Sequence, residues 1–200
     1  MPTFTIYQET DALNPREAEN KGRMLCKHRR YILGDVDASG DLSDMISGHP
    51  DFDSVSADFD RQDPASLFRL AQGLGIIAVY LELHLYDHSG ITMSTIPFSC
   101  AFDSGQVGVI YMTHSDMDTY YGGSEAHHCN QAKAHMKAEV KAYNAFISED
   151  IFGFILVDDD GTMICERSGY EGHDIETNGM LNDIDAQYHE LVRELSLIHI

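Results

Sequence analysis

Residues 76 to 113 read IIAVYLELHLYDHSGITMSTIPFSCAFDSGQVGVIYMT, and this stretch decides the fold. From Ile77 to Tyr86, apolar residues alternate with polar, aromatic or small ones. A period of two is typical of a β-strand that buries one face. The turn sequence DHSG (87–90) follows, and residues 91–95 and 107–113 can form two further strands. The stretch therefore predicts a central meander of three antiparallel strands.

Outside this stretch, the sequence alternates strand and helix patterns. We predict strands at residues 3–8 and 23–33, although helical spacing is an alternative for the second, and a hairpin over residues 152–167. Helix signals follow Asp63-Pro64 and Ser124, and a last helix is expected from Leu181. Strands paired in hairpins, with helices grouped after them, predict an α+β fold with a mainly antiparallel sheet and two to four helices.

The segment from Gly34 to Arg61 is acidic and lacks a clear period. We predict a long loop there, with a short helix as the alternative. Residues 35–43 match the opening of an EF-hand calcium loop, but Ile46 stands where the loop needs a bidentate glutamate. This mismatch disfavours calcium and favours an acidic surface segment.

The length and composition of the chain are typical of a globular protein. The chain has 200 residues, 43% of them hydrophobic, which is enough for one globular domain. Residues 195–200 read LSLIHI, the translation of a transposase end used in sequencing libraries, so we interpret them as an adapter artefact of metagenomic origin. The sequence thus predicts a single domain over residues 1–194. Its start resembles no signal peptide, and no apolar run is long enough for a membrane span, so we expect a cytoplasmic protein.

The charge balance bears on partners. Thirty-three acidic residues stand against thirteen Lys and Arg, for a formal net charge of -20. Binding to phosphates needs clustered basic residues, so direct nucleic-acid binding is disfavoured. Such a chain could instead occupy the basic groove of another protein as a DNA mimic, or could simply have a surface adapted for solubility.

One candidate site is catalytic. Cys100 could act as nucleophile and His88 as base, with Asp87 or Asp103 orienting the imidazole, since these residues all follow strand ends. Main-chain amides near Ser104 could stabilise an oxyanion. The alternative is a buried cysteine and a histidine that is hydrogen-bonded within its turn.

Two other candidate sites bind ligands. A zinc site would combine the C-x-H pair Cys26 and His28 with His88 and Cys100, if the strands that carry them are neighbours. A cluster of basic residues, KHRR at 27–30, could bind a phosphate or carboxylate, or pair with nearby Asp residues. The candidate binding residues are Arg29, Arg30, Ser89, Ser104 and Gln106.

Several motifs carry a resemblance to a family. They are NPRE (14–17), M-x-C-x-H-x-RY-x-LGD (24–35), YDHSG (86–90), PFSC (97–100) and DSGQVG (103–108). Together they resemble an uncharacterised family of phage and mobile-element proteins. The chain departs from the family pattern at Ala18 and around Cys165, where the pattern has tryptophan. No catalytic residue is implied by the resemblance.

Two classes of function remain open after this reading. The favoured one, implied by the genomic setting of the resembling family, is an accessory protein that binds and regulates a host protein inside a prokaryotic cell. The alternative is a small hydrolase or transferase that uses Cys100, His88 and Asp103, or a zinc ion held by the Cys/His set. Whether the protein is an enzyme is therefore left open by the sequence.

Overall fold

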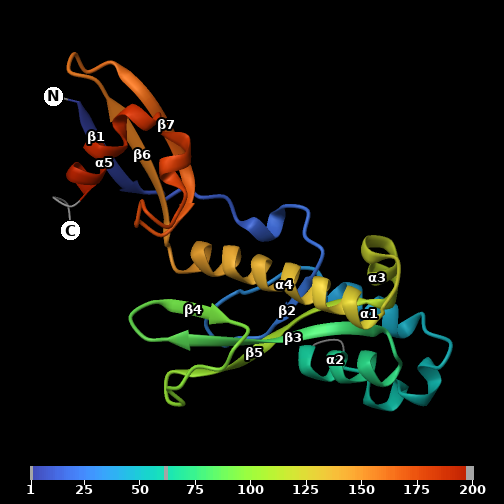
Figure 1. Cartoon of the computed structure of the whole chain (residues 1–200). Coiled ribbons are helices and arrows are strands. Elements are labelled where there is room, and N and C mark those ends of the chain that lie inside the picture. The colour runs from blue at the N-terminus through green and yellow to red at the C-terminus, as the bar shows by residue number, and fades with distance from the viewer. Residues whose placement is uncertain (1, 61–62, 197–200) are drawn as a thin grey trace. The chain divides into compact units, whose positions relative to one another are not determined.

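A computed structural model of the chain describes residues 2–60 and 63–196 (Figure 1). The residues fall into two compact units. One unit runs from Pro15 to Asn144, and the other combines the residues up to Asn14 with those from Ala145 onward. Each unit contains an antiparallel sheet and helices, which confirms the predicted α+β class with mainly antiparallel strands.

The sheet of the 15–144 unit has four strands. They are β2 (Arg23–Cys26), β3 (Ile77–Asp87), β4 (Ile91–Ser94) and β5 (Ser104–Thr113), in the order β2-β5-β3-β4. The predicted strands are therefore present, but β5 pairs with β3 and not with β4 as a meander would require. The connection from Thr95 to Asp103 is long enough to carry the chain past the end of β3 to its other edge.

Four helices belong wholly or mainly to this unit. They are α1 (Ala38–Ser47), α2 (Pro64–Gly73), α3 (His114–Tyr121) and α4 (Ala126–Ile147). Figure 1 shows α4 along one face of the sheet and α2 along the other. On the α4 side, a buried stripe of Ala132, Met136 and Val140 faces inward, as its steps of four predict. On the opposite side, α1 and α2 share a core with Leu25, Val109 and Tyr111 of the sheet.

The structure corrects two local predictions for this unit. After Gly34 it contains α1, the short helix that was the alternative to a loop, because Ala38, Leu42 and Ile46 lie four residues apart and are 2%, 0% and 0% exposed. The expected strand 23–33 ends at Cys26, after which the chain leaves the sheet. His28 therefore does not share a strand face with Cys26.

The second unit is a three-stranded sheet covered by helical segments on one side. Its strands are β1 (Thr3–Gln8), β6 (Ile151–Val157) and β7 (Met163–Glu171), in the order β1-β6-β7, with α5 (His189–Ser196) after them. Phe4, Phe154 and Val192 are among its buried core residues. Gly153 lies against the ring of Tyr7, and a Cβ atom there would stand 2.4 Å from it. Leu195, from the predicted artefact, packs on this core, and residues 197–200 lie outside the described residues.

The helix count exceeds the two to four expected from sequence. Five α-helices occur among the described residues, along with 3-10 turns at Pro15–Glu17, Phe52–Ser54, Ser56–Asp58, Met180–Asp183 and Ala186–Tyr188. The excess arises from short helices such as α1, whose apolar residues are separated by Asp, Ser and Gly. In the described part of the chain, no helix has both the length and the apolar composition that crossing a bilayer requires.

Candidate functional site

A groove of about 580 Å³ opens where β2 ends and β5 continues with β3 as its only described strand neighbour. Residues 27–30 form one wall, and residues 102–107 form the other. We call it the basic groove. Four of the five predicted binding residues line it: Arg29, Arg30, Ser104 and Gln106. The sequence placed these residues on separate connections, and the structure brings them together.

Side chains of the first wall are held in different ways. The Arg30 guanidinium pairs with Asp87 and lies over the Tyr31 ring at 5.3 Å, while the Tyr31 hydroxyl donates to Asp87 at 3.1 Å. Lys27 Nζ lies 3.3 Å from Asp63 Oδ1. Asp87, predicted to orient a catalytic histidine, is thus engaged with Arg30 and Tyr31 and stabilises the wall of the groove.

Arg29 differs from its neighbours. It is exposed, and no acidic partner for it occurs in residues 2–60 or 63–196. The adjacent His28 stacks on Tyr31 with ring centroids 5.0 Å apart. Burial, together with the positive charges of Arg30 and Arg29, lowers the pKa of His28. A neutral His28 leaves the guanidinium of Arg29 as the unpaired charge of this wall.

The second wall combines polar and apolar groups. Ser104 Oγ donates to the Cys100 carbonyl, which ties the start of β5 to the preceding connection. Gly105 and Gln106 are exposed along the strand. Phe102 lines the groove and is 99% exposed. Phe102 was not among the predicted site residues; the signal for it is an aromatic residue within a short polar segment that has no strand or helix period.

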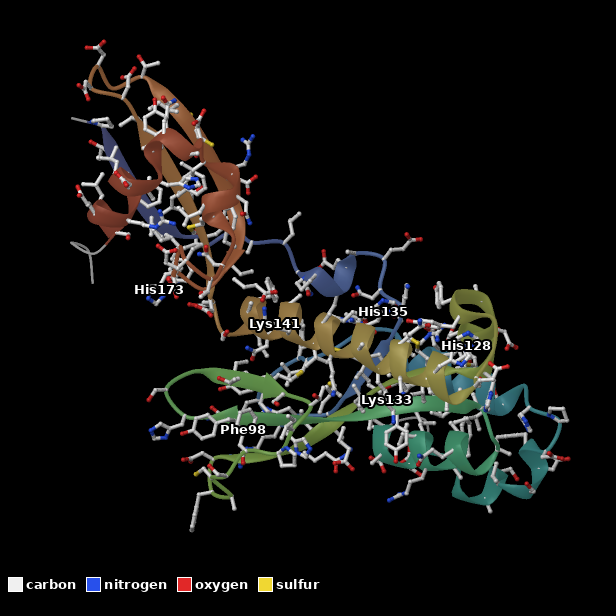
Figure 2. The ribbon with its side chains drawn as sticks, in the orientation of Figure 1. Phe98, His128, Lys133, His135, Lys141 and His173 are labelled. Atoms are coloured by element: carbon white, nitrogen blue, oxygen red, sulfur yellow. The ribbon has the colours of Figure 1, made fainter. Side chains whose placement is uncertain are left out.

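The predicted catalytic residues lie near this groove. Phe98, labelled in Figure 2, packs on Tyr86 of β3 with ring centroids 5.6 Å apart. This contact holds the 95–103 connection against the strand. Asp103 Oδ2 then lies 3.4 Å from His88 Nδ1 and accepts a hydrogen bond from Cys100 Sγ at 3.6 Å.

The order of these three groups matters chemically. In a nucleophilic triad the imidazole lies between the nucleophile and the carboxylate, so that it can take the nucleophile's proton. Here the Asp103 carboxylate lies between Cys100 and His88, and the His88 side chain is 63% exposed. Ser89, in the same turn, has a positive φ of 57° and does not line the groove.

The four proposed zinc ligands do not assemble. No group of three or more His, Cys, Asp or Glu side chains in the described ranges is arranged to hold a metal ion. β2 ends at Cys26, so His28 does not lie on the same strand face as Cys26, as the predicted site required. Part of Cys26 is open to solvent, but burial, with Asp35 second, raises the pKa of its thiol to about 12. A metal-binding thiolate is therefore disfavoured there.

The segment that resembles a calcium loop has another role. Asp35 accepts hydrogen bonds from Arg16 Nε at 2.7 Å and from the Met24 amide at 2.8 Å. Arg16 Nη1 also donates to Glu139 Oε2 at 3.0 Å. Residues from Ala38 onward form α1. The network thus links three distant segments through the arginine of the NPRE motif, whose role the sequence did not reveal.

Comparisons with protein families, curated proteins and solved structures give no match to this chain. The resemblance to phage and mobile-element proteins therefore depends on the motifs alone.

Proposed function

We propose that the protein is a phage or mobile-element accessory protein that binds a host protein through the basic groove. The observation that carries this proposal is the convergence of Arg29, Arg30, Ser104 and Gln106 on one groove. An unpaired guanidinium beside an exposed aromatic ring is the combination that anchors many protein interfaces. The proposed place of action is the cytoplasm of a prokaryotic cell.

Net charge supports a protein partner over a nucleic acid. The formal charge of -20 repels a phosphate backbone at long range, and one local cluster of basic residues cannot replace an extended basic surface. A single carboxylate on a partner protein needs only a single unpaired guanidinium. The groove supplies one in Arg29.

The test compares proteins captured from host lysate by three immobilised chains. These are the wild type, the groove variant Arg29→Glu, and the matched control Arg69→Glu, which reverses an exposed arginine on α2 away from the groove. We expect a host protein that the wild type and the control retain and the groove variant loses. Equal retention by all three, measured by quantitative mass spectrometry, contradicts the proposal.

A thiol-dependent hydrolase or transferase is the second candidate, because Cys100 and His88 share Asp103 Oδ2 as a neighbour. Rotation of the exposed His88 ring toward Cys100 would give the thiol a base. This function predicts that Cys100 reacts with iodoacetamide at neutral pH faster than Cys129, and that His88→Ala removes the difference. Equal rates for the two thiols would rule it out.

A further inference from the structure

The edge of β5 beside the basic groove is open. β2 pairs with residues Gly108 to Tyr111 of β5. Beyond this pairing, one more main-chain hydrogen bond joins the two segments, from the Lys27 amide to the Val107 carbonyl at 2.8 Å. Among the described strands, none pairs with Ser104, Gly105 or Gln106 on that side. An open strand edge offers main-chain donors and acceptors to another extended chain.

The direction of the main-chain groups follows from the β3 pairing. The Asp87 amide donates to Asp103 O at 2.7 Å, so the Asp103 carbonyl points toward β3. Main-chain groups alternate between the two edges of a strand. Those of Ser104 and Gln106 therefore point away from β3, into the basic groove.

The side chains on either side of this open edge indicate which side chains an added strand would carry. Arg29 offers an unpaired guanidinium on one side, and Phe102 offers a fully exposed ring on the other. The charge of -20 disfavours a strongly acidic ligand. The complementary segment would carry a single carboxylate for Arg29 and an apolar side chain for Phe102.

We propose that the host protein docks by β-strand addition: an extended segment with one Asp or Glu and a nearby apolar residue pairs with Ser104–Gln106 of β5. This inference rests on the proposed function and specifies the chemistry of the partner. The main-chain bonds hold the segment, Arg29 binds its carboxylate, and Phe102 packs on its apolar side chain.

The test titrates isotope-labelled full-length protein with a peptide of about eight residues, and follows the amide signals by NMR. The peptide contains threonine and valine with one central glutamate and one leucine. Its controls replace glutamate with glutamine, or carry N-methyl groups on all central amides. We expect saturable shifts at Ser104–Val107, about tenfold weaker binding for the glutamine peptide, and loss of binding on N-methylation.

Protein variants complete the test. Arg29→Gln should weaken binding of the glutamate peptide about tenfold, while the matched Arg69→Gln should leave it unchanged. Undiminished binding of the N-methylated peptide, or the absence of shifts at Ser104–Val107 at millimolar peptide, would overturn strand addition. If lysate capture still depends on Arg29 in that case, the proposed function survives and only this mode of docking fails.

Discussion

Arg16 shows how one charged residue can organise a unit. Its side chain is 3% exposed and donates to Asp35, to Glu139 and to the Gly22 carbonyl. Burial alone would lower the pKa of Arg16, but the hydrogen bonds to the two carboxylates outweigh it and raise the pKa. The guanidinium therefore stays charged and paired, and its removal would leave two carboxylates with main-chain amide donors but without their cationic partner.

We expect Arg16→Met to lower the free energy of unfolding by about 3–5 kcal/mol, since breaking a buried pair leaves an uncompensated charge. The matched control is Lys27→Met, which removes a 64% exposed cation that pairs with Asp63. That change should cost about 0–1 kcal/mol. Denaturant unfolding measures both. A similar small loss for the two variants would contradict the structural role of Arg16.

Cys26 gives a pH-dependent prediction at the same scale. Burial raises the pKa of its thiol from 9.0 to about 12, so the folded state binds this proton more tightly than the unfolded state. The resulting stabilisation is present below pH 9 and is lost as pH rises toward 12. At pH 8 we expect iodoacetamide to modify Cys129 in the native protein and Cys26 only after unfolding, as peptide mass mapping would measure. Rapid native modification of Cys26 would contradict the prediction.

The sequence predicted some site residues better than others, and the reason is physical. His88, Cys100 and Asp103 were predicted to lie on connections of one sheet, but the sequence did not show that they converge. They meet because β5 pairs with β3, which places Asp103 beside the turn that carries His88. The pairing of Cys26 with His28 instead assumed that a strand continued through residue 28. Where a strand leaves its sheet depends on the partner edge and not on its own period.

At the scale of elements, α1 shows why one helix was difficult to predict from the sequence. Ala38, Leu42 and Ile46 have helical spacing, yet Asp, Ser and Gly between them weaken any estimate from helix propensity. The helix forms because these three side chains bury against the core shared with α2 and the sheet. The β3 strand could be predicted without tertiary contacts, because its apolar residues alternate with other residues along its length.

A pair of substitutions in α1 tests this assignment. Leu42→Ala should lower the free energy of unfolding by about 2–5 kcal/mol, because Leu42 is fully buried. Gly40→Ala should raise it by about 0.5 kcal/mol, since a helical alanine is favoured over glycine and a Cβ atom there meets nothing within 4 Å. In a surface loop, neither change would have an effect of this size. Thermal and denaturant unfolding distinguish the two cases.

At the scale of the whole molecule, the 15–144 unit is inserted between the two segments that form the other unit, residues up to Asn14 and residues from Ala145 onward. β1 pairs with β6, so the smaller sheet needs both ends of the sequence before it can form. The 15–144 unit has its own sheet and its own buried core. A single domain over residues 1–194 remains a prediction, because sequence patterns describe elements and do not reveal how contacts divide among them.

Selective destabilisation can decide how far the two units fold separately. Phe4 is 2% exposed in the core of the unit that contains both ends of the chain, and Leu83 is fully buried in the other. Because each residue packs within its own unit, we expect Phe4→Ala to speed hydrogen exchange in β1, β6 and β7 while β3 and β5 keep their protection. Leu83→Ala should give the reverse pattern. Equal loss of protection throughout the chain in either variant would instead establish the single cooperative domain that composition predicts, since partial opening is then not available to either unit.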